Sequence, residues 1–149
     1  MYGADGDGRS VAEARKLARS LAPENFRHEK LEDMSFPDNF ADVVISSAVL
    51  HFARSEEQFR AMLHGTWRVL KPGGLFFCRL ASSIGIEKKI ERIEGRIHLL
   101  PDGSQRYLVD EALLIKLTQD LGGRFEDPLK TTVVQNQRSM TTWVVRKDS

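Results

Sequence analysis

Apolar side chains recur along this 149-residue chain with two different spacings, and each spacing predicts a different kind of element. Within residues 11–21 and 59–70 they return every three to four positions, as in a helix with one buried face. Ser10 precedes the first stretch and Ser55 the second, and each is followed three positions later by Glu or Gln, which is the capping-box pattern. We therefore expect two helices that begin at these serines.

Short apolar or β-branched runs lie between the helical stretches and predict strands. They comprise residues 1–5, 25–30, 41–46 and 75–80. The run at 41–46 suits a strand that is covered on both faces, and we expect it in the middle of a parallel sheet. Because strands and helices alternate, the first half of the chain predicts an α/β fold with a parallel sheet.

The second half of the chain predicts a change of strand direction. Residues 81–105 mix helical apolar spacing with lysines and arginines, and we expect a helical excursion over the sheet edge there. Asp110 should cap a further helix. Residues 131–135 and 141–146 are two strands joined by a short polar stretch, so they should be antiparallel. The expected fold is one α/β domain over residues 1–149, with a mostly parallel sheet that ends in an antiparallel hairpin.

Composition excludes several classes of function. Lysine and arginine number 22 and aspartate and glutamate 21, so a net charge of +1 gives no field that would gather nucleic acid or a membrane surface. No apolar run approaches the roughly 20 residues that span a bilayer, and no secretory signal opens the chain. The single Cys78 cannot form an internal disulfide, and the four histidines fall on different expected elements, so no metal site is expected. We expect a cytoplasmic protein without nucleic-acid or membrane partners.

Three segments with matching spacing resemble the central signature of class I S-adenosylmethionine-dependent methyltransferases. They are Phe36 to Asp38, Asp42 to Phe52 with its D-V-V-I-S-S-A-V-L-H-F run, and Trp67 to Gly74 with its L-K-P-G-G turn. The closing strand from Met140 to Val145 is also similar. The resemblance implies a Rossmann-like three-layer sandwich that uses S-adenosylmethionine, releases S-adenosylhomocysteine and methylates a small molecule.

The resemblance begins at the family's second strand. Gly3, Gly6 and Gly8 offer glycines, but only one helix separates them from the strand near Phe26, where the family has two helices and a strand after its glycine-rich loop. We therefore expect an N-terminally truncated domain without the first strand and that loop, in which methyl transfer is impaired unless the gene or expressed chain was cut. Loss of that strand would leave two sheet edges open, which predicts a rearranged sheet or a homodimer. The alternative function is a non-catalytic, dimeric binding or assembly module.

Three residues match cofactor-binding positions of the family. Asp5 matches the acidic residue that closes the second strand and would accept the ribose hydroxyls; a turn role is the competing interpretation. Leu31 follows the third strand and would offer its amide and apolar surface to the adenine, while Lys30 stands where the family has an aspartate. Ser47 lies after the fourth strand, against the methionine end of the cofactor, or it satisfies nearby backbone.

His51 lies at the mouth of the same crevice and is the candidate catalytic residue. Histidine titrates in the range that suits a general base. A packing role or a hydrogen bond at a helix terminus is the competing interpretation, because a sulfonium donor needs alignment more than it needs a base. A Rossmann oxidoreductase is the rival enzyme, but the chain lacks the glycine fingerprint of that class too.

Overall fold

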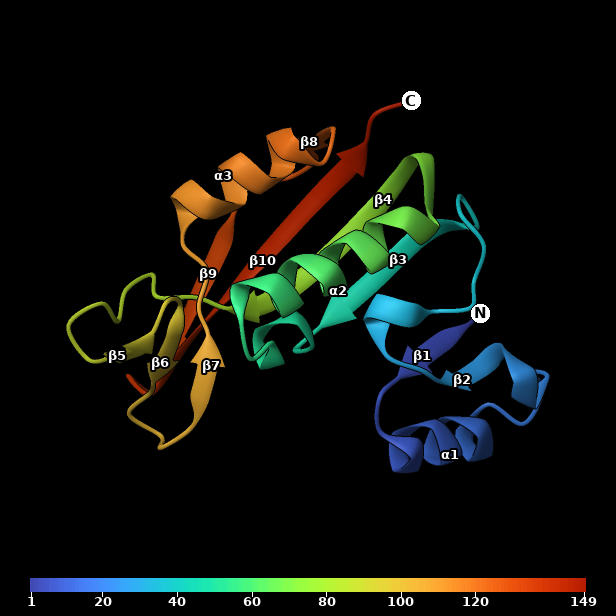
Figure 1. Ribbon diagram of the computed structural model, residues 1–149, viewed down its shortest axis with the longest axis horizontal. Coiled ribbons are helices and arrows are strands. Elements are labelled where there is room, and N and C mark those ends of the chain that lie inside the picture. The colour runs from blue at the N-terminus through green and yellow to red at the C-terminus, as the bar shows by residue number, and fades with distance from the viewer.

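A computed structural model describes all residues, 1–149, as a mixed α/β fold (Figure 1). The strands and α-helices follow the chain in this order: β1 (Gly3–Asp5), α1 (Gly8–Leu17), β2 (Phe26–His28), β3 (Ala41–Ser47), α2 (Glu56–Val69), β4 (Leu70–Ala81), β5 (Glu91–Glu94), β6 (Ile97–Leu99), β7 (Gln105–Tyr107), α3 (Glu111–Asp120), β8 (Gly123–Phe125), β9 (Lys130–Val134) and β10 (Arg138–Lys147). Three 3-10 helices lie between them: η1 (Pro23–Asn25), η2 (Leu31–Asp33) and η3 (Leu50–Phe52).

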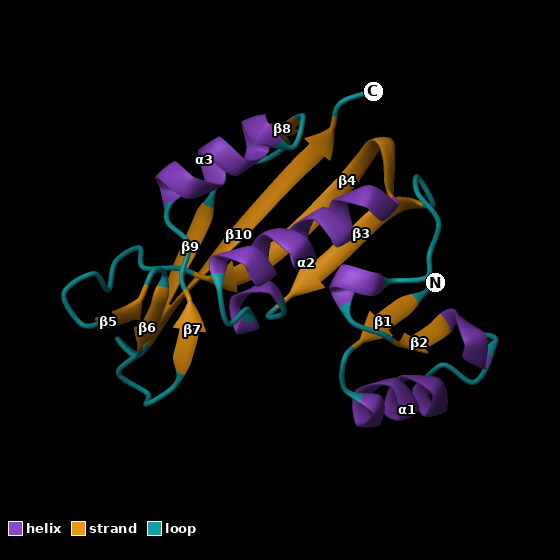
Figure 2. Cartoon of the chain, in the orientation of Figure 1, coloured by secondary structure: helices purple, strands orange, loops and turns teal.

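The largest sheet has the strand order β3-β4-β10-β8, and β9 pairs with β10 (Figure 2). β3 and β4 are parallel, whereas β10 runs antiparallel to β4, β8 and β9. The parallel strands and the closing antiparallel hairpin that the sequence predicts are therefore confirmed. Ser55 and Asp110 also cap α2 and α3 as expected, each accepting a hydrogen bond from a backbone amide of the first turn.

The main hydrophobic core lies between this sheet and helices α2 and α3. Trp143 of β10 is fully buried there, and its indole Nε1 donates to Thr118 Oγ1 of α3 at 3.0 Å. Trp67 of α2 packs edge to face against Phe76 of β4, which in turn contacts Trp143. A buried Trp whose N–H has a partner combines a large apolar contribution with no unsatisfied donor. This packing fixes α2 and α3 on one face of the sheet.

The opposite face of β3 and β4 exposes apolar side chains. Val43 is 54% exposed, Ile45 72% and Phe77 37%. Their neighbours along the strands, Val44 and Phe76, point to the helix-covered core, because side chains alternate across a strand. β3 is therefore the terminal strand of its sheet and is covered on one face, so the expectation of a central strand buried on both faces is wrong.

β1 and β2 form a separate parallel pair, against which α1 packs. The N-cap of α1 is Asp7 rather than Ser10, since the Asp7 carboxylate accepts from the Arg9 amide at 3.1 Å. Ser10 lies within the first turn and donates its hydroxyl proton to Asp7. Both residues are good caps, but the earlier one gives the longer helix. The strands expected at 1–5 and 25–30 are confirmed.

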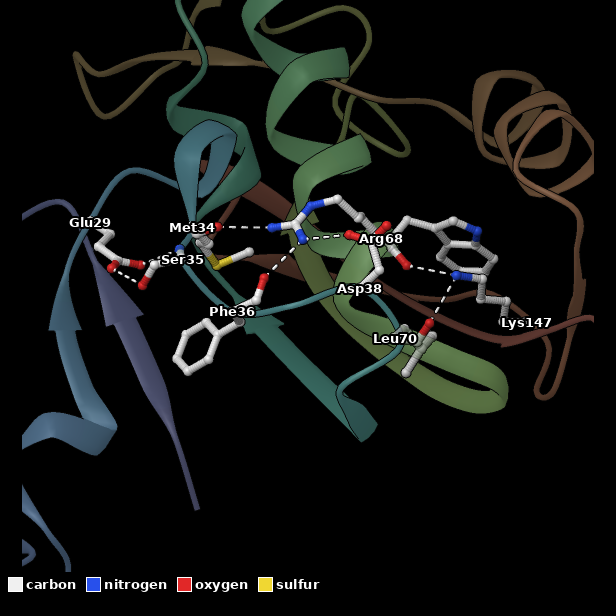
Figure 3. A network of polar contacts seen from close by, with 9 residues as sticks. Glu29, Met34, Ser35, Phe36, Asp38, Arg68, Leu70 and Lys147 are labelled. Carbon is white, nitrogen blue, oxygen red and sulfur yellow. Dashed lines mark hydrogen bonds and ion pairs between the residues drawn. The ribbon is translucent and has the colours of Figure 1, made fainter.

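Arg68 of α2 fixes the segment that joins the β1–β2 pair to the large sheet (Figure 3). Its guanidinium donates to the carbonyl oxygens of Met34 at 2.9 Å and Phe36 at 2.8 Å, and to the Asp38 carboxylate at 2.7 Å. One planar group with five donors can satisfy three acceptors at once. The connecting segment is thereby anchored to the same helix that covers the core.

Residues 91–107 form a three-stranded antiparallel sheet, β5-β6-β7, so the expected helical excursion over residues 81–105 is wrong. Two glycines with positive φ explain the difference: Gly95 (φ 53°) joins β5 to β6 and Gly103 (φ 84°) joins β6 to β7. Glycine adopts this backbone region without a Cβ clash, which favours tight hairpin turns over a continuous helix. The basic residues of this region therefore do not form one helix face.

Candidate functional site

The candidate site lies at the edge where the parallel strands end. In Figure 1, β1, β2, β3 and β4 all point toward the same side of the molecule. Their final residues include Asp5, Ser47 and Ala81. In α/β sheets, ligands bind beyond the carboxyl ends of parallel strands, where loops rather than strands approach the ligand. The residues at this edge are therefore the candidate ligand contacts.

Asp5 is the last residue of β1 and is exposed. Its Oδ1 accepts from the Asp7 backbone amide at 2.8 Å, which is the geometry of an Asx turn. Its Oδ2 accepts no hydrogen bond within the chain, so one carboxylate oxygen is available to a ligand. The structure therefore gives Asp5 a turn role and leaves an acceptor free at the strand end.

Leu31 opens η2 and is partly buried against the main core. Its position depends on Gly65 of α2, because a Cβ built on Gly65 would lie 2.1 Å from the Leu31 carbonyl oxygen. No real Cβ approaches a backbone oxygen so closely, so only glycine allows α2 to pack against η2. Gly65 was not singled out in the sequence, where a glycine inside the helical pattern is the only signal.

Ser47 is the last residue of β3, is exposed, and lies opposite Arg79 in the parallel register. Its hydroxyl has no hydrogen-bond partner within the chain. The following residue, Ala48, has a positive φ of 57° and donates its amide to the Arg79 carbonyl at 2.9 Å. A non-glycine residue in this region is strained, and such strain is found where the chain turns sharply at functional sites.

His51 lies in η3 and is 6% exposed. Its Nδ1 accepts a hydrogen bond from the Ala81 backbone amide at 2.9 Å, so the neutral ring carries its proton on Nε2. Burial, together with the positive charges of Arg106 and Arg79, lowers the pKa of His51 from 6.5 to about 4. The imidazole is neutral at physiological pH, its Nδ1 is used by the Ala81 amide, and its Nε2 carries the proton and has no hydrogen-bond partner within the chain.

A cavity of about 150 Å³ lies beside His51 and brings together three arginines that sequence reasoning missed. They are Arg79 at the end of β4, Arg106 of β7 and Arg138 at the start of β10. A charged residue inside the buried run of β4 was a possible signal for Arg79. Arg106 and Arg138 lie on hairpins far apart in the sequence, and no spacing rule connects them.

The cavity includes His51 and Ala48, whereas Asp5, Leu31 and Ser47 are not among its lining residues. The expected site residues thus form two groups. Asp5, Leu31 and Ser47 lie outside the cavity, and His51 lines it together with the arginines. No group of three or more His, Cys, Asp or Glu side chains is placed to hold a metal ion. No helix is long and apolar enough to cross a membrane.

Comparisons with known proteins agree with this geometry. The sequence profile of the family described as "Methyltransferase domain" matches residues 1–78, just over half of the chain. The ubiquinone/menaquinone biosynthesis C-methyltransferase UbiE of Zymomonas mobilis is 35% identical over 68 residues, which are 46% of this chain and 27% of that protein. The matched part thus spans about a quarter of the length of this curated relative.

Two solved structures share the fold. A methyltransferase of Methanosarcina mazei, described as S-adenosylmethionine-dependent, aligns with a TM-score of 0.74 at 17% identity and covers 99% of this chain and 81% of its own. A Burkholderia thailandensis 1,6-didemethyltoxoflavin-N1-methyltransferase, solved with bound 1,6-didemethyltoxoflavin and S-adenosylhomocysteine, aligns with a TM-score of 0.70 at 14% identity over 98% of this chain and 60% of its own. Profile and fold together show that the chain belongs to the methyltransferase-domain family, in the class I S-adenosylmethionine-dependent group.

Proposed function

We propose that this chain binds S-adenosylmethionine at the carboxyl edge of β1 and β3 and serves methyl transfer to a small-molecule acceptor. S-adenosylmethionine is the cofactor of the family, and S-adenosylhomocysteine is its product. The observation that carries the proposal is the unused Oδ2 of Asp5 at the end of a parallel strand. A carboxylate in this place can accept hydrogen bonds from a ribose.

The chemistry asks little of acid or base groups in the protein. The cofactor supplies a methyl group on a positively charged sulfur, which is already a reactive donor. The chain would hold the ribose with Asp5, support the adenine with Leu31, and meet the methionine end with the free hydroxyl of Ser47. Its contribution would be alignment of acceptor and donor and exclusion of water.

His51 suits a hydrogen-bond donor in the acceptor cavity better than it suits a general base. Its Nδ1 lone pair is used by Ala81, and its pKa of about 4 makes it a weak base at physiological pH. An N–H on a neutral ring can still orient an acceptor oxygen or nitrogen. We therefore propose a positioning role for His51, with proton removal, where the acceptor needs it, left to water or to the acceptor itself.

Titration calorimetry with S-adenosylhomocysteine tests the cofactor site without knowledge of the acceptor. We expect Asp5→Asn to weaken binding about tenfold or more, because the amide keeps the turn with Asp7 but loses a charged acceptor. Asp42→Asn is the matched control, since Asp42 is an exposed aspartate at the opposite end of β3. Absence of binding by the folded chain, or equal affinity of both variants, would refute the proposed site.

A second candidate function is a dimeric assembly module, and the exposed face of β3 and β4 favours it. β3 pairs with β4 on one side only, and Val43, Ile45 and Phe77 are exposed beside its free edge. A free strand edge flanked by apolar residues is a surface on which a second copy can pair. A homodimer is thus the proposed partner state. A cytoplasmic location stays a prediction from the sequence.

A further inference from the structure

The cavity beside His51 has an unusual charge. Three guanidinium groups line it, those of Arg79, Arg106 and Arg138, against one carboxylate, Asp102. None of the three arginines makes an ion pair within the chain, whereas other arginines do, such as Arg68 with Asp38. A folded chain normally pairs or fully solvates its arginines, so several unpaired guanidinium groups around one hollow mark a place for an anion.

The single carboxylate does not neutralise this cluster. Asp102 Oδ1 accepts from the backbone amide of Ser104 at 2.9 Å and from its hydroxyl at 2.5 Å. These two bonds hold the aspartate within the hairpin turn between β6 and β7. They also lower the pKa of Asp102, and the positive charges of Arg106 and Arg138 add to this effect. Asp102 makes no ion pair with an arginine, so one carboxylate faces three guanidinium groups.

The arginines are held in place by different parts of the fold. Arg79 is partly buried at the end of β4, where its backbone pairs with β3 and β10. The guanidinium of Arg106 lies 4.6 Å above the Phe52 ring and donates to the Gln105 carbonyl at 2.7 Å. Arg138 is exposed at the start of β10. One cation held by side-chain contacts, one on a paired strand and one exposed cation make a site that is partly preformed and open to solvent.

The size of the cavity limits what it can hold. About 150 Å³ is smaller than the roughly 300 Å³ at which whole-ligand pockets begin, so it fits a head group and not a complete ligand. Ala48 also lines it, and Ala48 directly follows Ser47, the proposed contact for the methionine end of the cofactor. A head group bound here would leave the rest of an acceptor beside the donor.

We propose that this arginine cavity binds the oxyanion of the methyl acceptor, so the acceptor is an anionic small molecule that carries a carboxylate or a phosphate. The identification of the bound anion as the methyl acceptor rests on the proposed function. The anion site itself rests only on the geometry of the cavity. Arg79 and Arg106 are the specificity-determining residues, and Arg138 adds a third positive charge on the solvent-exposed side of the site. A neutral isostere of the same shape leaves these cations unpaired and binds weakly.

The test uses the whole chain and three simple aromatic probes: benzoate, its neutral isostere benzamide, and phenyl phosphate. Binding is measured by titration calorimetry and by the shifts of the Ala81 and His51 resonances in nitrogen-edited NMR spectra. We expect benzoate or phenyl phosphate to bind about tenfold or more tightly than benzamide. A preference for benzoate assigns a carboxylate acceptor, and a preference for phenyl phosphate assigns a phosphorylated one.

Matched variants then assign the effect to the cavity. Arg79→Gln and Arg106→Gln should each weaken binding of the preferred anion about tenfold, while Arg19→Gln in the turn after α1 should not change it. Dispersed NMR spectra confirm that each variant is folded, and Arg106→Lys, which keeps the charge, should recover part of the affinity. Equal binding of all three probes, or anion affinity that neither Arg79→Gln nor Arg106→Gln lowers, would overturn the inference.

A parallel titration with S-adenosylhomocysteine separates this inference from the proposed function. If the chain binds the cofactor but shows no preference for anions, the methyltransferase proposal stands and the inference of an anionic acceptor is refuted. If the chain prefers anions through Arg79 and Arg106 but does not bind the cofactor, the oxyanion site stands and the proposed methyl transfer is refuted.

Discussion

The Ala81 backbone amide donates to Nδ1 of His51 at 2.9 Å, and this bond ties the end of β4 to the 3-10 helix after β3. Nδ1 can accept this bond only while it carries no proton, and both groups are buried, so protonation of the ring would break a buried hydrogen bond. The bond also fixes one wall of the arginine cavity. Stability of this region should therefore depend on pH.

We predict that the chain loses stability on acidification because His51 resists protonation. Its pKa is about 4 in the folded state and 6.5 in the unfolded state, so between these values the unfolded chain binds the extra proton. This contribution to the free energy of unfolding is fully present above about pH 6.5 and is lost as the pH falls through about 4. Its total is on the order of 3 kcal/mol. Urea unfolding at several pH values measures it.

His51→Gln provides the comparison for this prediction. The glutamine carbonyl can accept from the Ala81 amide but does not titrate. The wild-type chain should lose more stability than the variant between about pH 7 and about pH 5. Parallel curves for the two proteins would show that His51 does not carry the linkage.

The helices and the core of this fold follow from local patterns in the sequence. Ser55 and Asp110 stand directly before helical stretches, and each caps the helix that follows. The expected start of α1 at Ser10 is wrong, because Asp7 is also a capable cap and lies three residues earlier. The hairpins at residues 91–107 were missed because their apolar spacing also fits a helix, and the positive φ at Gly95 and Gly103 decides between the two.

The candidate site was predictable only in part. Asp5 and Ser47 end strands, and strand ends in a parallel sheet gather at one edge, so their side of the molecule could be inferred. The arginine cavity could not be, because β4, β7 and β10 each contribute one member and their contacts span long sequence separations. Residues that meet only through tertiary packing leave no periodic signal.

We predict that Gly65→Ala destabilises the chain, although glycine to alanine in a helix interior normally stabilises by roughly 0.5–1 kcal/mol. The new Cβ would lie 2.1 Å from the Leu31 carbonyl, so α2 or η2 must move, at a cost of about 1–3 kcal/mol. Denaturant unfolding of both proteins measures the change in the free energy of unfolding and shows whether the substitution stabilises or destabilises. Glu57→Ala on the exposed face of the same helix should change stability little, and a stabilising Gly65→Ala would contradict the close approach.

We predict that Arg68→Ala loosens the segment between η2 and β3. The variant leaves the Met34 and Phe36 carbonyls and the Asp38 carboxylate without their shared donor, at a cost of about 1–3 kcal/mol. Amide hydrogen exchange should quicken across residues 34–40 before it changes elsewhere. Arg60→Ala, which removes an exposed pair with Glu56, should cost less than about 1 kcal/mol. Unchanged exchange in this segment would show that other contacts hold it.

We predict that Ile45→Lys weakens self-association and leaves the fold intact. Ile45 is 72% exposed beside the free edge of β3. Burial of its side chain against a second copy would therefore stabilise a dimer. Each copy would contribute the same residue across a two-fold interface, so a charge there acts twice and should raise the dimer dissociation constant at least about tenfold. Light scattering across a concentration series measures this, with Ile93→Lys on β5, where the isoleucine is also half exposed, as the matched control. A chain that stays monomeric at high concentration, or that dimerises equally well with lysine at position 45, would remove this face as the interface and with it the assembly role.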